Sequence, residues 1–426
     1  MSRSVASFVP SASVVEHLYV HVPFCAHKCE YCAFYSAPPS GDQVNRYVAA
    51  LVGELEMIAP RCRPKTVFFG GGTPSLLTLK QWETVLEAMR RLGLLGAAEF
   101  SVECNPATVS EDKARLLRSA GVNRISMGVQ SLDPGMLERL GRVHSREMVF
   151  RSYDILRKAG FDSVNVDLMF AIPGQTLELW ERTLAEALAL GTEHLSCYEV
   201  IYEEDTPLFE QLKAGEIDVD EELACAQYDA LVDRSAAVGF RQYEVANFAR
   251  DRRAGERGES GAFTGPGMSD VPAFACRHNV AYWMGHDFFG CGPSASEYVD
   301  GMRSRNWANT TMYCEQSERG RRSKEFAEAL GPLARAGELA AFGLRMNAGW
   351  RYTEFEARTG FDLRNEWAED LRFLEACGWA ERGEAGFRLN RQGLRFADSA
   401  AVRMLRPEAA EAGVAGTRAR IPLVEA

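Results

Sequence analysis

The sequence predicts an α/β fold built on a parallel β-sheet, and two patterns support this prediction. Between about Leu18 and Val245, six short apolar runs alternate with stretches whose apolar residues have helical spacing. Strands that alternate with helices in this rhythm form βαβ units, which place the strands parallel to one another. Several of the helical stretches also end at a glycine, a common helix stop signal. The predicted strands are residues 18–24, 66–72, 100–106, 124–131, 163–170 and 194–201.

Amphipathic helices are predicted between these strands, at residues 44–58, 79–93, 111–121, 146–160 and 177–191. Helical spacing of apolar residues returns near the C-terminus. There, residues 386–398 indicate a short strand or two followed by the start of a helix. We therefore expect a small, mainly helical C-terminal domain with a winged-helix-like end.

Changes in composition and in apolar periodicity along the chain give the predicted domain organisation. The stretch 250–275 is rich in Gly, Arg and Ser and lacks periodicity, which indicates a flexible insertion. The predicted parts are an N-terminal extension (1–16), the parallel-sheet domain (17–249), the insertion (250–275), a connecting region (276–324), the C-terminal domain (325–406) and a frayed tail (407–426).

Composition limits the kind of partner and the compartment. The net charge of −11 argues against nucleic-acid binding, which normally needs a basic stripe. No apolar run reaches the roughly 18 residues of a transmembrane helix, and residues 1–17 lack the apolar core of a secretory signal. Eleven cysteines without paired spacing indicate reduced thiols. We expect a cytoplasmic protein whose oligomeric state the sequence leaves open, a homodimer included.

Three cysteines at CxxxCxxC spacing, Cys25, Cys29 and Cys32, directly follow the first apolar run. Three thiolates this close can share one metal cluster. A cubane [4Fe–4S] cluster normally takes four cysteine ligands, so one iron would be open to a small molecule. A zinc site would need four closed ligands, and no second CxxC pair follows. A disulfide framework would need an exported chain. The motif therefore predicts an open [4Fe–4S] cluster.

Glycine and polar residues follow the later strands. The turn GGGTPS, residues 70–75, comes directly after the second predicted strand, where glycine allows close backbone approach to a ligand, although an ordinary tight turn has the same composition. Glu103, Gln130, Arg142 and Asp167 lie at or just after strand ends, where burial is costly without a partner. Each could instead be a satisfied polar residue of the barrel. Sites in parallel barrels form at the carboxyl ends of the strands, so we expect these residues to meet.

Together, these motifs resemble the radical S-adenosylmethionine (SAM) superfamily, and within it the oxygen-independent coproporphyrinogen III oxidase family. The resemblance covers about residues 17–400 and is carried by YxHxPFCxxxCxYC, GGGTP, ECNP, GVQS and DLM, in this order. It implies a partial (β/α)6 barrel, a [4Fe–4S] cluster on the three cysteines, and SAM bound at the open iron. The resemblance assigns to SAM the residues Tyr19, Tyr31, Gly71, Gly72, Thr73, Glu103, Gln130, Arg142 and Asp167.

The resembled family contains oxidases and haem chaperones, and two features favour the chaperones. The oxidases have a further cysteine two residues beyond the third, and Phe34 stands in that place here. The chaperones carry an HNxxYW motif, which is present at residues 278–283. The resemblance thus implies a chaperone that binds haem and delivers it to apo-haemoproteins, and it leaves open whether SAM is turned over. The alternatives are oxidative decarboxylation of coproporphyrinogen III and a non-catalytic iron–sulfur scaffold.

His278, the first residue of the HNxxYW motif, is the candidate haem ligand. Histidine is a common proximal haem ligand, and Tyr282 and Trp283 offer apolar area that can cover a porphyrin face. The alternative is a histidine buried beside packed aromatic residues. Unlike in the resembled family, the 250–275 insertion precedes the motif. We interpret Cys276 as an incidental thiol and Cys291 as a turn residue without a chemical role.

Overall fold

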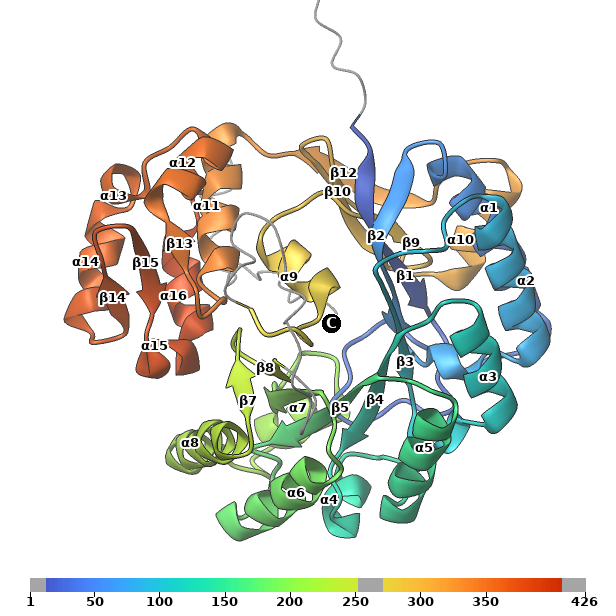
Figure 1. The fold of residues 1–426 in the computed structure, drawn as a ribbon, viewed down its shortest axis with the longest axis horizontal. Coiled ribbons are helices and arrows are strands. Elements are labelled where there is room, and N and C mark those ends of the chain that lie inside the picture. The colour runs from blue at the N-terminus through green and yellow to red at the C-terminus, as the bar shows by residue number, and fades with distance from the viewer. Residues whose placement is uncertain (1–12, 252–270, 408–426) are drawn as a thin grey trace, which may run out of the picture.

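A nine-stranded sheet forms the centre of the computed structural model, which describes residues 13–251 and 271–407 (Figure 1). Six of its strands run parallel and in chain order. They are β1 Val15–Val22, β2 Cys62–Gly71, β3 Glu99–Cys104, β4 Arg124–Gln130, β5 Ser163–Phe170 and β6 His194–Glu199. At one edge β9 (Phe289–Cys291) pairs with β1, and at the other β8 (Asn247–Arg250) and β7 (Phe240–Gln242) follow β6. Within the described residues these two edges do not pair, so the barrel is partial.

Helices cover the outer side of this sheet (Figure 1). They are α1 Gln43–Ile58, α2 Leu79–Arg91, α3 Glu111–Ser119, α5 Arg146–Lys158, α6 Leu177–Ala189 and α8 Glu221–Ala237. The short helices α4 (Pro134–Arg139) and α7 (Pro207–Lys213) lie instead beside the loop that follows β1. The five helices and six strands predicted from the sequence are all present, with ends that differ by a few residues. The predicted fold class, a partial (β/α)6 barrel, is confirmed.

Polar side chains at the N-termini explain where several of these helices begin. Thr78 accepts a hydrogen bond from the backbone of Gln81, and the Gln81 side chain accepts one from the Thr78 backbone, forming a capping box. Ser110 caps α3 and Thr176 caps α6 through the side-chain oxygen alone, each accepting a hydrogen bond from the backbone N–H three residues on. Such caps satisfy N–H groups that have no partner inside the helix.

The apolar core lies between the sheet and the outer helices. Trp82 of α2 and Trp180 of α6 are fully buried, and each packs against a phenylalanine of the sheet, Phe69 and Phe170. Burying side chains of this size contributes about 1.5–3 kcal/mol each. The packing fixes the strands, and with them the loops at their carboxyl ends.

The segment after the barrel contains more structure than the sequence indicated. α9 (Arg277–Trp283) carries the HNxxYW motif, and β10 (Ser296–Val299), β11 (Met302–Asn306) and β12 (Lys324–Ala329) form an antiparallel sheet, with α10 (Thr310–Glu318) packed on α1. The interpretation of Cys291 as a turn residue is wrong, because this cysteine ends the edge strand β9. Residues 252–270 of the predicted insertion, 1–12 of the predicted extension and 408–426 of the predicted tail lie outside the described residues.

The C-terminal part is mainly helical, as predicted, with a small sheet. Its helices are α11 Pro332–Gly343, α12 Tyr352–Thr359, α13 Leu363–Glu366, α14 Ala368–Ala376, α15 Arg391–Arg395 and α16 Ala397–Met404, and its strands are β13 Trp350–Arg351, β14 Ala380–Arg382 and β15 Gly386–Leu389. None of the helices in residues 13–251 and 271–407 has the length and apolar character needed to cross a membrane.

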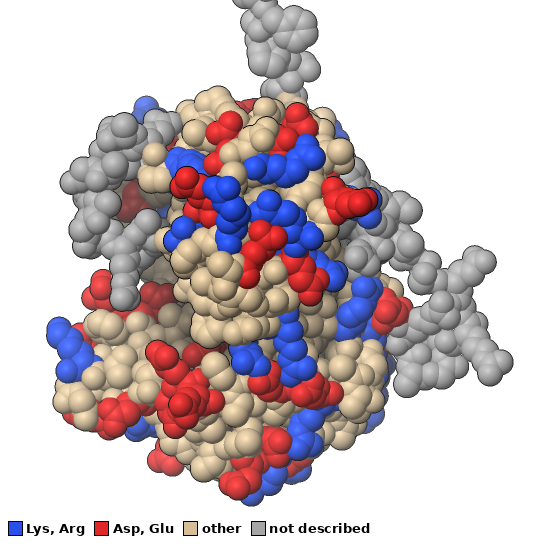
Figure 2. Space-filling view, turned by 90° about the vertical axis from the view of Figure 1, so that its left-hand side faces the viewer, with Lys and Arg blue, Asp and Glu red and all other residues tan. Residues whose placement is uncertain are grey.

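Ion pairs join the C-terminal part to the barrel. Arg391 of α15 contacts Asp229 at 2.9 Å and Asp233 at 2.6 Å, both on α8, and Arg395 also pairs with Asp229. Figure 2 views the molecule from this side and shows acidic and basic side chains interspersed over the face.

Candidate cofactor site

A cavity of about 840 Å³ opens at the carboxyl ends of the barrel strands. Its lining includes the three cysteines of the CxxxCxxC motif and most of the residues that the sequence assigned to SAM. The predicted residues that line it are Cys25, Cys29, Tyr31, Cys32, Gly71, Gly72, Thr73, Glu103, Gln130, Arg142 and Asp167. Two predicted residues, Tyr19 and His278, do not line it. The structure thus places eleven of the thirteen predicted site residues around one space.

The loop after β1 carries the cysteines and is fixed by backbone hydrogen bonds. The N–H of Glu30 donates to the Leu140 carbonyl at 3.2 Å, and the Glu30 carbonyl accepts from the N–H of Leu208 at 3.0 Å. Arg142 Nη1 lies 3.4 Å from Cys29 Sγ, and Thr73 Oγ1 lies 3.4 Å from Cys25 Sγ. The cysteine loop is therefore held by the segments that follow β2, β4 and β6.

The donor set of this loop suits a cluster better than a single ion. Among the described residues, no group of three or more His, Cys, Asp or Glu side chains is arranged around one metal position. Cysteines that hold a cubane cluster bind different irons, so their sulfurs need not converge on one point. Burial raises the pKa of the Cys32 thiol to about 11, so a bound cation would be needed to keep this ligand as a thiolate. The three thiols fit an iron–sulfur cluster.

The glycine turn after β2 is tied to both β1 and β3. Gly71 has φ +100°, a conformation that side chains rarely adopt, and its N–H donates to Glu103 Oε2 at 3.2 Å. The N–H groups of Gly72 and Thr73 donate to the carbonyls of Val22 and Phe24, at 2.8 and 2.7 Å. A Cβ on Gly72 would lie 2.7 Å from both of those carbonyl oxygens. Only glycine therefore fits this turn, which lies between the cysteine loop and Glu103.

Polar residues of β4 and β5 complete this wall of the cavity. Gln130 has φ +66°, an uncommon conformation for a residue with a side chain, and such strain often marks functional sites. Arg142 Nη2 donates to the Gly128 carbonyl at 2.5 Å. Burial raises the pKa of Asp167, and hydrogen bonds from Asn165 and other neighbours partly oppose this. Burial also raises the pKa of the Tyr31 hydroxyl, which therefore stays protonated beside Arg142.

His278 lies in the barrel interior, away from the cavity. The side chain is 7% exposed, and its Nδ1 is 2.9 Å from Thr66 Oγ1 on β2. Its ring packs near Phe68 and Tyr19, with centroids at 5.4 and 6.4 Å. Burial lowers the pKa of His278 to about 3, so the imidazole is neutral. Trp283 at the other end of the same motif does line the cavity.

A buried glutamate fixes the start of α9. Glu99 of β3 accepts hydrogen bonds from the N–H groups of Arg277 and His278, at 2.8 and 3.0 Å, and lies 3.5 Å from Cys276 Sγ. These contacts satisfy backbone donors that a helix start leaves unpaired. Burial raises the pKa of Cys276 to about 12, so this cysteine is an unreactive thiol, consistent with the sequence interpretation.

A second buried chain of hydrogen bonds runs from α9 toward the cavity. The N–H of Cys276 donates to Tyr243 Oη at 3.1 Å, and this hydroxyl lies 2.8 Å from His194 Nε2. His194 Nδ1 is 2.6 Å from Asn165 Oδ1, and Asn165 Nδ2 donates to Asp167 Oδ1 at 2.6 Å. Because the amide oxygen of Asn165 only accepts, His194 carries its proton on Nδ1. The barrel interior therefore links α9 to Asp167 through side chains.

Acid should destabilise the fold because two histidines, His17 and His278, are buried in it. Burial lowers the pKa of His17 and of His278 to about 3, below the ordinary 6.5, so the unfolded chain binds protons that the folded chain excludes. Stability present above pH 6.5 is then lost as the pH falls toward 3, by about 1.4 kcal/mol per pH unit for each histidine. Urea unfolding at pH 7.5 and 5.5 measures this loss. His17→Gln should lower the difference, and an unchanged difference would contradict the assignment.

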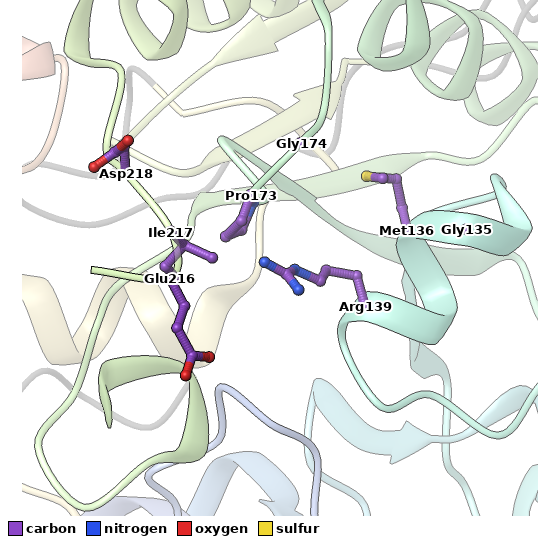
Figure 3. Close-up of a pocket in the computed structure, with 8 residues that line it drawn as sticks. All are labelled: Gly135, Met136, Arg139, Pro173, Gly174, Glu216, Ile217 and Asp218. Atoms are coloured by element: carbon purple, nitrogen blue, oxygen red, sulfur yellow. The ribbon is translucent and has the colours of Figure 1, made fainter. Parts of the chain in front are cut away.

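Several cavity residues had no signal in the sequence. Glu244, Arg345 and Phe396 reach the cavity only through tertiary packing. Tyr198, near the end of the predicted strand 194–201, could have been found from its position. A second, smaller hollow of about 430 Å³ lies between α4, the loop after β5 and residues 216–218 (Figure 3). Arg139 points into this hollow toward Ile217, and no cysteine or histidine lines it. The large cavity, which the three cysteines of the CxxxCxxC loop line, is therefore the candidate cofactor site.

Known proteins are similar to this chain in sequence and in fold. The chain matches the Radical SAM superfamily over residues 19–187 and the HemN C-terminal domain over residues 330–396. The heme chaperone HemW of Bacillus subtilis is 32% identical over 382 residues, which cover 88% of this chain and 95% of the relative. The mitochondrial radical S-adenosyl methionine domain-containing protein 1 of Danio rerio is 33% identical, over 83% of this chain and 78% of its own.

A solved structure agrees with the fold. Coproporphyrinogen III oxidase (HemN) from Escherichia coli has a TM-score of 0.76 and 22% identity, and the match covers 92% of this chain and 90% of that chain. The barrel and its cysteine motif thus define a radical SAM protein, a class that uses a [4Fe–4S] cluster and SAM. Within this class, the chain belongs to the HemW family.

Proposed function

We propose that this protein is a haem chaperone, which binds haem and delivers it to apo-haemoproteins while carrying a [4Fe–4S] cluster and SAM. The relatives named heme chaperone HemW support this proposal. The observation that carries it is that the cysteine loop, the glycine turn and Glu103 border one cavity, while Phe34 stands where the oxidases have a further cysteine. Phe34 itself lines that cavity.

Each group of residues that lines the cavity has a proposed role in binding the cluster or SAM. Cys25, Cys29 and Cys32 would hold the cluster, which supplies an electron to SAM when both are bound. The backbone of residues 71–73 would approach the amino-acid end of SAM, because this turn carries no side chain at Gly71 and Gly72. Glu103 offers a carboxylate for the amino group. The remaining SAM residues proposed from the resemblance are Tyr31, Gln130, Arg142 and Asp167, which line the cavity, and Tyr19, which does not line it.

His278 stays the predicted ligand of the haem iron. A neutral imidazole is the form that binds iron, and burial keeps His278 neutral. Its Nδ1 contacts Thr66, so Nε2 would be the ligating nitrogen. Because the ring is enclosed by Phe68 and Tyr19, ligation would require α9 to move away from the barrel interior.

The proposed compartment is the cytoplasm. All eleven cysteines lie in the described residues and are free thiols. Free thiols are usual where glutathione and thioredoxin keep proteins reduced. The three cysteines of the cluster loop would also need reduced thiols to accept iron.

Two parallel assays test the proposed function. Anaerobically reconstituted protein is titrated with haem and is separately supplied with coproporphyrinogen III, with the E. coli oxidase as the positive control. We expect saturable haem binding at one site and no measurable conversion of coproporphyrinogen III. Formation of protoporphyrinogen at the rate of the control would instead support the oxidase alternative. Absence of haem binding would contradict the chaperone proposal.

A further inference from the structure

One part of the cofactor cavity, here called the far half, is lined by residues that belong neither to the cluster loop nor to the proposed SAM set. It is formed where α8 and the segment after β7 face the C-terminal helices, and it is lined by Tyr228, Trp283, Arg345, Arg395 and Phe396. Cavities of about 300–1,000 Å³ hold drug-sized ligands, and this one has about 840 Å³ in all. The far half can therefore take a ligand of its own beside SAM.

Aromatic side chains give this half the character of a site for a flat, apolar ligand. Trp283 and Tyr228 are buried in its walls, while Phe396 is 37% exposed at its rim. Ile201, another rim residue, is 47% exposed. Large apolar side chains that stay exposed around one opening often mark a binding site. Trp283 belongs to the HNxxYW motif, so this motif contributes directly to the cavity through its last residue.

Two arginines supply positive charge at the same end. Arg345 lies over the Trp283 ring at 4.7 Å and pairs with Asp398 at 2.5 Å, and Arg395 pairs with Asp229. The Asp398 side chain is 64% exposed, and ion pairs with exposed partners are weak enough to exchange for a ligand carboxylate. An arginine has five N–H donors, so each can serve a second carboxylate.

Carboxylates lie beside these arginines, as Asp398 and Glu244 do beside Arg345, and also on the other walls. Glu199, Glu221 and Glu244 line the cavity from β6, α8 and the segment before β8. Burial raises the pKa of Glu199 and of Glu244, and the neighbouring Arg345 partly opposes the shift of Glu244. An anionic ligand edge would exchange for the exposed Asp398 at Arg345, the arginine contributed by the C-terminal part beside Trp283.

We propose that the far half of the cavity is a porphyrin subsite, in which the ring packs against Trp283, Tyr228 and Phe396 and its carboxylates contact Arg345 and Arg395. The proposal rests on the proposed haem-chaperone function and deepens it. The subsite lies on the side of α9 away from the His278 imidazole, so it holds the ring without using an iron ligand from that histidine.

Iron-free protoporphyrin IX tests this subsite, because it has the ring and carboxylates of haem but no iron. Its binding is followed by fluorescence titration of the reconstituted, full-length protein. Arg345→Gln and Arg395→Gln should each weaken binding about tenfold, the usual effect of losing a charge-assisted hydrogen bond. Phe396→Ala should weaken it several-fold through lost ring contact.

Matched controls come from the same domain. Arg391 pairs with the same Asp229 but does not line the cavity, and Phe373 is 41% exposed on α14, also off the cavity. Arg391→Gln and Phe373→Ala should leave affinity within about twofold of the wild type, inside the usual scatter of surface substitutions. The dimethyl ester of the porphyrin should bind weakly and respond equally to wild type and both arginine variants.

The outcomes separate this proposal from the function on which it rests. Wild-type protein that binds neither haem nor protoporphyrin IX would contradict the proposed function. Haem binding with unchanged affinity in the Arg345, Arg395 and Phe396 variants would overturn the subsite alone. His278→Ala should change the haem Soret band and leave protoporphyrin IX affinity unchanged. A loss of protoporphyrin IX binding in His278→Ala equal to that in the arginine variants would also overturn the subsite.

Discussion

Replacing Cys25, Cys29 and Cys32 by alanine together should abolish cluster assembly, so that the reconstituted variant holds essentially no iron. Wild-type protein should hold about four irons per chain, the content of one cubane cluster. The three thiols are the cysteine side chains of the loop after β1, and Thr73 and Arg142 contact two of their sulfurs. Iron content after anaerobic reconstitution and desalting measures the effect, together with the change that SAM causes in the EPR spectrum of the reduced wild type.

Cys225→Ala is the matched control for this variant. Cys225 is a free, partly buried thiol that lines the same cavity from α8, but it is not part of the CxxxCxxC loop. The control should keep its iron and its response to SAM. If Cys225→Ala loses iron as the triple variant does, the cluster has a fourth protein ligand and no open iron for SAM. If the triple variant keeps its iron, the ligand assignment is wrong.

Gly71→Ala should remove SAM binding and destabilise the barrel. A residue with a side chain at φ +100° costs about 1–3 kcal/mol in backbone strain. The added Cβ would also lie 2.4 Å from the His21 ring, which is buried behind the turn. Moving the turn would pull its N–H from Glu103, which shapes the proposed site for the SAM amino group. Isothermal titration with SAM and urea unfolding measure the two effects.

Gly121→Ala separates strain from steric overlap. Gly121 has φ +99°, almost the value at Gly71, but a Cβ there meets no atom within 4 Å. This control should lose only the strain energy and should bind SAM like the wild type. Equal destabilisation in both variants would show that the backbone of the turn shifts to make room for the Cβ at position 71. Normal SAM affinity in Gly71→Ala would remove the glycine turn from the proposed SAM site.

Local patterns explain why most of the barrel could be predicted from sequence. Each parallel strand is a short apolar run, and each outer helix has apolar spacing and a polar cap such as Thr78 or Ser110. The edge strand β9 was missed because it has only three residues, one of them Gly290, and is a strand only through pairing with β1. The β10–β12 sheet was missed because its strands lack clear alternation, with exposed apolar residues such as Met302 and Phe326.

The difference between local sequence patterns and contacts between distant segments also decides which parts of the site could be predicted. Gly71, Glu103 and Asp167 lie on β2, β3 and β5, strands whose order is set by the βαβ rule, so their convergence could be expected. The placement of His278 could not, because α9 is oriented by Glu99 and Thr66, which are far away in sequence. The motif alone does not say which of its side chains faces the cavity, and the structure places Trp283 there instead of His278.

The buried contacts of α9 limit how this family can vary. The helix reaches Asp167 through Tyr243, His194 and Asn165, and it is capped by Glu99. These partners come from several different strands and the segment beside them, so α9 is not an exchangeable module. A barrel without Glu99 or Tyr243 would leave buried backbone N–H groups of residues 276–278 without partners, each costing about 1–3 kcal/mol. Grafting the HNxxYW motif onto another radical SAM barrel would succeed only if the interior polar residues were transferred with it.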